Sequence, residues 1–391
     1  MRRRLRVRLV SNCFGVLASV ATAGPLAAQT FPSSAGPLKI ETVVRGLERP
    51  WSLAFLPNDR MLVTERPGRM RIATVAGGLS PPVAGVPRVF VREQSGLHDV
   101  ALDHRFAQNS TIYFCFNADE SGAVSVARAI LRADERLMLD DVSIIFRQEG
   151  PPPGLPGQNT VCRIVQWPDG NLFISLGDHY NPREHAQNLA DHLGKIVRIR
   201  PDGSVPPDNP FVATPGAKPE IWSLGHRNPQ GLARNPADGR LWEQEHGPRG
   251  GDEINIIERG RNYGWPVITY GKDYNGATIG IGTHKDGMEQ PVWHWTPAIA
   301  PSGMTFYSGK LWPEWRGSLF NGALRGKMLA RLHIAGDRVM AEERLLTGLD
   351  ERIRDVREGP DGALWLLTDN DDGRILRLVP AAAPAAKSVQ P

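Results

Sequence analysis

The chain has 391 residues, of which 46 are Lys or Arg and 42 are Asp or Glu, and its formal net charge is +4. The first 28 residues contain five arginines and no acidic residue, so residues 29–391 carry 41 basic and 42 acidic side chains and are nearly neutral. Balanced charge gives no electrostatic reason to expect nucleic acid or an anionic membrane surface as a partner, and both are excluded from the prediction.

Residues 1–28 have the pattern of a secretory signal peptide. They begin with MRRRLRVR, continue through the apolar stretch LVSNCFGVLASVATAG and end in LAA before Gln29. We therefore expect a periplasmic protein. No later apolar run approaches the roughly 18 residues that a membrane span needs. We predict one domain over residues 29–380 and a disordered tail, AAAPAAKSVQP, at 381–391.

One pattern recurs along the rest of the chain: a short apolar strand, a turn of Pro, Asp, Asn or Gly, and a second apolar strand. Asn-Asp and Asp-Gly steps accept the positive φ of tight turns, so each copy predicts a β-hairpin. The six copies are WSLAFLPNDRMLVTER from Trp51, LHDVALDHRFAQNSTIYFCFN from Leu97, CRIVQWPDGNLFISLGD from Cys162, PQGLARNPADGRLWEQEHG from Pro229, SGMTFYSGKLWPEWRGSLFNGAL from Ser302 and IRDVREGPDGALWLLTD from Ile353.

Six similar hairpins at intervals of about 45 to 75 residues indicate a radial repeat. We predict an all-β fold, a six-bladed β-propeller with about four strands in each blade and the first strand of each hairpin nearest the channel. A β-sandwich with insertions is the alternative, but the regular spacing of the hairpins argues against it. Loops at the ends of inner strands converge on a propeller channel, so residues at the hairpin ends are candidates for a binding site.

Two cysteines remain after the signal segment. Cys115 lies in the strand-like run IYFCFN and Cys162 in TVCRIV. An oxidising compartment permits a disulfide between them, but free buried thiols are the favoured interpretation, because buried cysteine also behaves as a small apolar residue.

The segment SLGHRNPQG places Arg227 and Asn228 directly before an expected inner strand. Arginine offers five donors in a planar fork, and asparagine both donates and accepts. This pair suits the oxygens of a carboxylate or a quinone. The alternative is a turn capped by the asparagine.

The segment WEQEHGPRGGDEIN, residues 242–255, crowds four carboxylates around a Gly-Pro and a Gly-Gly step. In a solvated loop Arg249 would offset part of their repulsion. Around a hard cation the same features are useful, because calcium takes six to eight oxygen ligands and glycine lets the chain turn carbonyls inward. Both interpretations stay open on these residues alone.

Five long motifs together resemble the soluble quinoprotein sugar dehydrogenases, specifically the periplasmic aldose sugar dehydrogenase branch of the glucose/sorbosone dehydrogenase family. They are SLGHRNPQG, EHGPRGGDEINI, GRNYGWP, RIRDVREGPDG and GKIVRIRPDGSVPPDNPF. The resemblance covers nearly all of the chain after the signal segment. It implies a six-bladed propeller that binds pyrroloquinoline quinone (PQQ) and Ca²⁺ and oxidises the anomeric carbon of aldoses to a lactone.

The resemblance also implies a set of site residues. The cofactor would be held by Gln94, Arg227, Asn228, Arg325, Arg352 and Arg354, with Trp295 as a wall of the quinone site or as a core residue. The backbone carbonyls of Gly247 and Pro248 would bind the calcium that also contacts PQQ. The carboxylate of Glu253 and the carbonyl of Tyr263 would belong to a second, structural calcium. At position 325 the relatives carry Lys, so Arg325 replaces a point charge with a fork.

The chain departs from the family at the general base. The family's catalytic His lies four residues before the Arg that matches Arg163, and here that position is Asn159. Asparagine has no basic nitrogen near neutral pH. His98 and His179 are two candidate substitutes. The neighbouring Asp178 matches the acidic residue that orients the base in part of the family.

Two classes of function therefore remain open. The first is a PQQ-dependent sugar dehydrogenase with an unidentified electron acceptor. The second is a propeller that binds PQQ, a sugar or a protein partner with little or no redox chemistry. A calcium-dependent lactonase is a weaker third option, since that chemistry needs a carboxylate-rich channel rather than this arginine-rich set.

Overall fold

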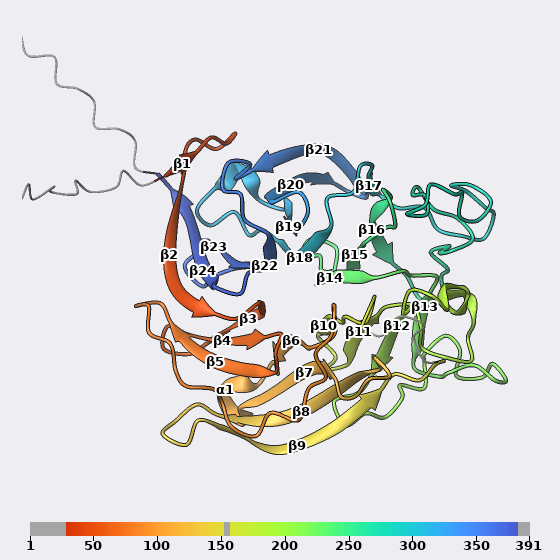
Figure 1. Ribbon diagram of the computed structural model, residues 1–391, viewed down its shortest axis with the longest axis horizontal. Coiled ribbons are helices and arrows are strands. Elements are labelled where there is room, and N and C mark those ends of the chain that lie inside the picture. Colours follow the sequence, from red (N-terminus) through yellow and green to blue (C-terminus); the bar gives the residue numbers. More distant parts are fainter. Residues whose placement is uncertain (1–28, 152–156, 382–391) are drawn as a thin grey trace, which may run out of the picture.

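The computed structural model describes residues 29–151 and 157–381, in which 24 strands form six antiparallel sheets around a common axis (Figure 1). The predicted signal peptide and all but the first residue of the predicted tail lie outside these ranges. The prediction of an all-β, six-bladed propeller is confirmed.

The first three sheets follow one another in the sequence. The first sheet contains β3 (Pro50–Leu56), β4 (Arg60–Glu65) and β5 (Arg69–Thr74). The second contains β6 (Leu97–Leu102), β7 (Thr111–Asn117), β8 (Val124–Arg132) and β9 (Met138–Arg147). The third contains β10 (Ile164–Gln166), β11 (Leu172–Leu176), β12 (Lys195–Ile199) and β13 (Ile221–Leu224).

The other three sheets complete the ring. The fourth sheet contains β14 (Pro229–Arg234), β15 (Leu241–Glu245), β16 (Asp252–Ile257) and β17 (Trp293–Trp295). The fifth contains β18 (Pro301–Phe306), β19 (Leu319–Ala323), β20 (Met328–Ala335) and β21 (Arg338–Leu345). The sixth contains β22 (Ile353–Glu358), β23 (Leu364–Thr368), β24 (Gly373–Pro380), β2 (Leu38–Leu47) and β1 (Thr30–Phe31).

Helices are short and lie between strands. They are α1 (Phe106–Asn109), η1 (Arg183–Gln187) and η2 (Pro313–Trp315). Within the described ranges, no helix has the length and apolar character that a membrane crossing requires.

Each predicted repeat forms the first two strands of one sheet, from β3–β4 to β22–β23. The β10–β11 turn shows why these sequences turn. Gly170 has a φ of 91°, and the carboxylate of Asp169 accepts from the backbone N–H and the side-chain amide of Asn171 at 2.9 and 2.8 Å. The inner strands β3, β6, β10, β14, β18 and β22 each contact the next around the ring, and β22 contacts β3 (Figure 1).

The ring is closed by the two ends of the described chain. Strand β2 pairs with β24 from Leu38 opposite Pro380 to Leu47 opposite Gly373. The sixth sheet therefore takes its inner strands from the end of the domain and its outer strands from the start. This pairing covers an edge that would otherwise be open to other chains.

Apolar side chains fill the space between neighbouring sheets. Between the fourth and fifth sheets, for example, Trp242 and Ile254 pack with Met304, Phe306 and Leu319. The blades are therefore held together by contacts between sheet faces, while backbone hydrogen bonds hold each sheet.

Cys115 on β7 and Cys162, just before β10, are joined by a disulfide between the second and third sheets. The expectation of two free thiols is therefore wrong. The physical reason is the ring itself, which places the two strands side by side with the Cα atoms 6.6 Å apart, within the span of a disulfide.

We predict that the double variant Cys115→Ala/Cys162→Ala is less stable than the oxidised wild type by about 2–4 kcal/mol, because the disulfide no longer restricts the unfolded chain. Urea unfolding with and without a reductant measures this difference. Reductant should bring the wild type to the midpoint of the variant and leave the variant unchanged. Equal stability of the variant and the oxidised wild type would contradict the prediction.

Candidate active site

Three adjoining cavities lie at one end of the propeller, where loops that precede inner strands meet loops that follow second strands. The central cavity has a volume of about 250 Å³, the arginine cavity about 230 Å³ and the tyrosine cavity about 300 Å³. The central and arginine cavities share Gln94, His246 and Ala300. The central and tyrosine cavities share Tyr180, Arg227, Pro248 and Tyr274.

The arginine and central cavities carry an excess of positive charge. Three carboxylates line them: Glu93, Asp252 and Asp369. Six guanidinium groups line them as well: Arg49, Arg66, Arg227, Arg325, Arg352 and Arg354. Because charges in a recess are poorly solvated, this imbalance favours a ligand with several negative charges.

Arg352 and Arg354 reach the arginine cavity from the start of β22. Both form salt bridges with Asp369, at 2.8 and 3.1 Å. Burial alone would raise the pKa of Asp369, but the two guanidiniums outweigh it and hold the pKa at about 2. Arg354 also donates to Gln230 Oε1 at 3.2 Å and Ser302 Oγ at 3.3 Å. These contacts fix the guanidiniums before any ligand binds.

Arg227 lies in the loop before β14 and lines both the central and the tyrosine cavity. Its Nη1 donates to the backbone carbonyls of His246 and Gly247 at 2.9 and 2.8 Å. The guanidinium carbon lies 5.3 Å from the ring centre of Trp265. The positive charge is therefore held at the boundary between the two cavities.

Gln94 and Asn228 meet across the central cavity. The side-chain amide of Asn228 donates to Gln94 Oε1 at 3.1 Å, although the two residues precede different inner strands, β14 and β6. The backbone N–H groups of Arg227 and Asn228 both donate to Glu245 Oε2. The structure thus brings Gln94, Arg227 and Asn228 together.

The loop after β15 contains the two carbonyls that the resemblance assigns to calcium. Asp252 accepts hydrogen bonds from the backbone N–H groups of Gly247, Ile299 and Ala300 at 2.8–2.9 Å, and burial raises its pKa to about 6. A Cβ at Gly247 would come within 2.2 Å of the carbonyl oxygen of Gly251, so only glycine fits. The turn therefore holds its backbone tightly at the rim of the central cavity.

Arg325 and Trp295 differ in their placement. Arg325 follows β19, is exposed and lines the central cavity. Trp295, on β17, is 3% exposed and packs with Trp242 and Ile254 between the fourth and fifth sheets. Trp295 lines none of the three cavities, so its surroundings are those of a core residue.

The acidic segment around Gly247 is not a solvated loop. Glu243 and Glu245 lie on β15 and Glu253 lies opposite Glu245 on β16, with Glu243 and Glu245 at 0% and 3% exposure. Burial, followed by repulsion from Glu245, raises the pKa of Glu243 and of Glu253 well above the usual range. His226 Nδ1 lies 3.7 Å from Glu245 Oε1, and the His226 ring stacks on Tyr263.

These three glutamates lack a strong positive partner. Within the described residues, their one ionic contact within 4 Å is that of Glu245 with His226, and no Lys or Arg forms a salt bridge with them. Nδ1 of His226 and Oε1 of Glu243 are buried without a hydrogen-bond partner, and atoms of His226, Glu243 and Glu245 that could bind a metal lie within 4.8 Å of one another. Glu243 and Glu245 are buried and Glu253 is half-buried, and buried carboxylates of this kind require bound protons or a cation.

Asn159 lines the central cavity just before β10, in the left-handed region at φ 50°. Its side-chain amide donates to Asp178 Oδ1 at 2.8 Å. Asp178 follows β11 and is fully buried, and burial raises its pKa against the opposing effect of Arg227. The structure therefore joins Asn159 and Asp178 in one contact.

His98 and His179 do not line any of the three cavities. His98 packs against Trp51 with ring centres 5.0 Å apart and the rings tilted by 39°, its Nε2 bonds to the Gln94 carbonyl at 2.9 Å, and burial lowers its pKa to about 3. Nε2 of His179 bonds to Gln148 Oε1 at 3.0 Å, and burial lowers the pKa of His179 to about 4. Both imidazoles are neutral, enclosed side chains.

His246 is an imidazole that does line the central and arginine cavities. Its Nε2 donates to the carbonyl of Pro301 at 2.8 Å, and burial lowers its pKa to about 3. A base with this pKa is a weak proton acceptor at neutral pH.

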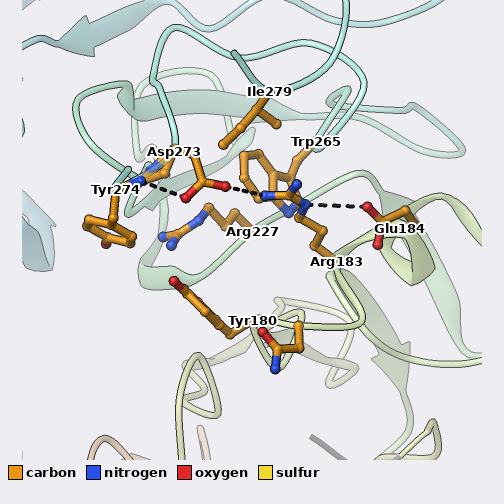
Figure 2. Close-up of a pocket in the computed structure, with 10 residues that line it drawn as sticks. Tyr180, Arg183, Glu184, Arg227, Trp265, Asp273, Tyr274 and Ile279 are labelled. Atoms are coloured by element: carbon orange, nitrogen blue, oxygen red, sulfur yellow. Dashed lines mark hydrogen bonds and ion pairs between the residues drawn. The ribbon is translucent and has the colours of Figure 1, made fainter. Parts of the chain in front are cut away.

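Apart from Arg227 and Pro248, the residues that line the tyrosine cavity were not predicted from the sequence (Figure 2). Tyr180 and Tyr274 stack with ring centres 6.4 Å apart, and Arg183 bonds to Asp273 at 3.1 Å across the same cavity. Tyr180, Asp273 and Tyr274 lie in loops and Arg183 begins η1, and no alternation of apolar residues marks these segments. Among the residues that were not predicted, Trp265 lies in the GRNYGWP motif, which is a signal that could have found it.

Comparisons with protein families, known proteins and solved structures all identify sugar dehydrogenases as relatives. The profile of the Glucose / Sorbosone dehydrogenase family matches residues 47–377. An aldose sugar dehydrogenase of Escherichia coli is 43% identical over 348 residues, which cover 88% of this chain and 93% of that protein.

Solved structures agree with this. A crystal structure of a glucose dehydrogenase is 47% identical, with a TM-score of 0.83 over 88% of this chain and 100% of the other. The PQQ-bound form of an aldose sugar dehydrogenase from Streptomyces coelicolor is 30% identical, with a TM-score of 0.71 over 88% and 98% of the two chains. The chain therefore belongs to the glucose/sorbosone dehydrogenase family.

Proposed function

We propose that the protein is a PQQ-dependent dehydrogenase that oxidises the anomeric carbon of aldose sugars to lactones. The observation that carries this proposal is the excess of six guanidiniums over three carboxylates in the arginine and central cavities. PQQ is a tricarboxylate with an ortho-quinone, so its charge and its acceptor oxygens fit this donor set. The PQQ-bound relative from Streptomyces coelicolor and the aldose sugar dehydrogenase of Escherichia coli support the same assignment.

Bound PQQ would supply the two-electron acceptor of the reaction. Arg325, Arg352 and Arg354 would balance its carboxylates, and Gln94 and Asn228 would hydrogen-bond to it. Arg227 would stabilise negative charge on a quinone oxygen, because its guanidinium is already held at the boundary of the central cavity.

We propose two calcium sites. The carbonyls of Gly247 and Pro248 would hold one Ca²⁺ against the cofactor, where it would act as a Lewis acid. The Gly247 carbonyl accepts from Arg227 and keeps a second lone pair for the ion. The second, structural calcium would use Glu253 and the carbonyl of Tyr263, and the shortage of positive charge at Glu243 and Glu245 supports a cation there.

We propose that the protein works in the periplasm. The composition of residues 1–28 supports export, and the Cys115–Cys162 disulfide suits an oxidising compartment.

A propeller that binds PQQ or a sugar with little turnover is the second candidate function. Asn159 favours it, because this side chain occupies the expected position of the base. The arginine-rich cavities argue against a lactonase.

The calcium assignment predicts that PQQ binds much more weakly in EDTA, by at least about tenfold, because part of the charge balance is lost. PQQ absorbance can be titrated with the apoprotein in EDTA and again after Ca²⁺ is restored. An affinity that EDTA leaves unchanged would reject a calcium shared with the cofactor.

For Arg227→Ala we expect turnover to fall by roughly 10²- to 10³-fold and PQQ affinity to fall much less, since the charge matters most as the quinone oxygen becomes anionic. Steady-state kinetics and a PQQ titration separate the two effects. Arg227→Lys keeps the charge without the fork and should lose less turnover. Equal losses in turnover and affinity would instead assign Arg227 a structural role.

For Asn159→His we expect faster aldose oxidation, by up to the 10²- to 10⁴-fold that a general base contributes, because the new imidazole would lie beside Asp178. The variants His98→Ala and His179→Ala should leave turnover nearly unchanged. If one of these two alanine variants abolishes activity and Asn159→His increases turnover only slightly, the histidine that was replaced by alanine is the base. If PQQ binds to the wild type and to all three variants but none of the four oxidises aldoses, the protein is a PQQ-binding propeller and not a dehydrogenase.

A further inference from the structure

Asp178 connects four residues that line the central and tyrosine cavities. Its Oδ1 accepts from the side-chain amide of Asn159 and from the backbone N–H of Tyr180, both at 2.8 Å. Its Oδ2 accepts from the indole N–H of Trp265 at 2.7 Å, and its own backbone N–H donates to the carbonyl of Arg227 at 2.9 Å. The side chain of Asp178 is fully buried and lines none of the three cavities.

This contact determines which way the amide of Asn159 faces. Both oxygens of Asp178 accept hydrogen bonds from N–H groups, and Oδ1 faces the NH₂ end of the Asn159 amide at 2.8 Å. The oxygen end is then turned away from Asp178. Within the described residues that oxygen has no hydrogen-bond partner, and Asn159, which is 2% exposed, lines the central cavity. The cavity is thus offered a hydrogen-bond acceptor.

The backbone around Asn159 is fixed independently of its side chain. Ser95 Oγ and Thr160 Oγ1 are 2.8 Å apart, and the backbone N–H of Gln94 donates to the carbonyl of Gly157 at 2.8 Å. A Cβ at Gly177 would lie 2.0 Å from the carbonyl oxygen of Asn159. With the backbone held on both sides, the amide of Asn159 depends on Asp178 for its orientation.

We propose that Asp178 is a positioning residue that turns the amide oxygen of Asn159 toward the substrate, where it accepts the hydrogen of the hydroxyl on the carbon to be oxidised. Asn159 holds this hydroxyl and does not take its proton. In the oxidation, bound quinone would supply the acceptor for the C–H hydrogen and its electron pair. The O–H bond would break as the carbonyl forms, and the proton would pass to water rather than to Asn159. This inference rests on the proposed function and assigns Asn159 the selection of a free hydroxyl at that carbon.

The test compares binding of D-glucose with binding of 1,5-anhydroglucitol, which has hydrogen in place of the anomeric hydroxyl. Calorimetry is performed on protein loaded with Ca²⁺ and reduced PQQ, which cannot accept a hydride. One hydrogen bond to a neutral acceptor should make the wild type prefer glucose by about 3- to 10-fold. Asn159→Ala should abolish this preference.

Asp178→Ala should also abolish the preference, and the double variant should lose no more than either single variant, because Asp178 acts through Asn159. Asn171→Ala is the matched control. Its amide bonds to the carboxylate of Asp169 at the opposite end of the same β10–β11 hairpin, so this variant loses the same type of contact and should keep the preference.

A preference that survives in Asn159→Ala would overturn the proposal, and one that survives only in Asp178→Ala would overturn the positioning role. If Asp178→Ala does not fold, the comparison of Asn159→Ala with Asn171→Ala still decides whether the amide selects the hydroxyl. Failure of the wild type to bind PQQ would reject the proposed function instead, and the same calorimetry on calcium-loaded apoprotein would then decide the hydroxyl contact.

Discussion

The structure depends on one buried arginine at the axis of the propeller. Arg163 is 2% exposed and lies 3.3 Å from Asp99 and 3.1 Å from Asp355, which project from inner strands of the second and sixth sheets. Its Nε donates to the carbonyl of Gln230 on β14, and its guanidinium stacks over Trp51 of β3 at 4.0 Å. Burial alone would raise the pKa of Asp99, but Arg163 and Arg357 outweigh it and lower the pKa. Arg163 itself directly precedes β10 of the third sheet, so its contacts join five of the six sheets. Removing one partner from such a buried network costs about 3–5 kcal/mol.

Residues of this network also line the arginine cavity or lie next to residues that do. Trp51 stacks on Arg163 from one side and lines the arginine cavity, and Arg354, next to Asp355 on β22, extends into the same cavity. The strands thus supply a fixed base in which Arg163 is paired with Asp99 and Asp355. The loops around it add the guanidiniums of Arg49, Arg66, Arg227 and Arg325. An anionic ligand can be bound there without reorganisation of the core, since the residues that face it are already paired to buried partners such as Asp369.

The fold was predictable because each hairpin carries its own turn chemistry, as in the Pro-Asp-Gly-Asn turn before β11, and this information is local. Closure by β2 was not predicted, because nothing in residues 38–47 marks them as partners of β24. The disulfide was missed for the same reason, since the contact between Cys115 and Cys162 exists only once two blades are adjacent. At the site, the resemblance indicated Asn159 and Asp178, but Tyr180 and Tyr274 lie in long loops whose course depends on packing. For Trp295 the sequence allowed two interpretations, a wall of the cofactor site and a core residue, because both require a large apolar side chain. The structure places it in the core.

Because the sixth sheet takes β2 from the start of the domain and β24 from its end, the ring cannot close until the whole domain has been made. Contacts between such distant segments form slowly, since the long intervening chain must first be ordered. During that interval β2 has an unpaired edge that can pair with another chain. A protein built this way should complete its fold late, and the same closure should make the finished ring slow to unravel from either end.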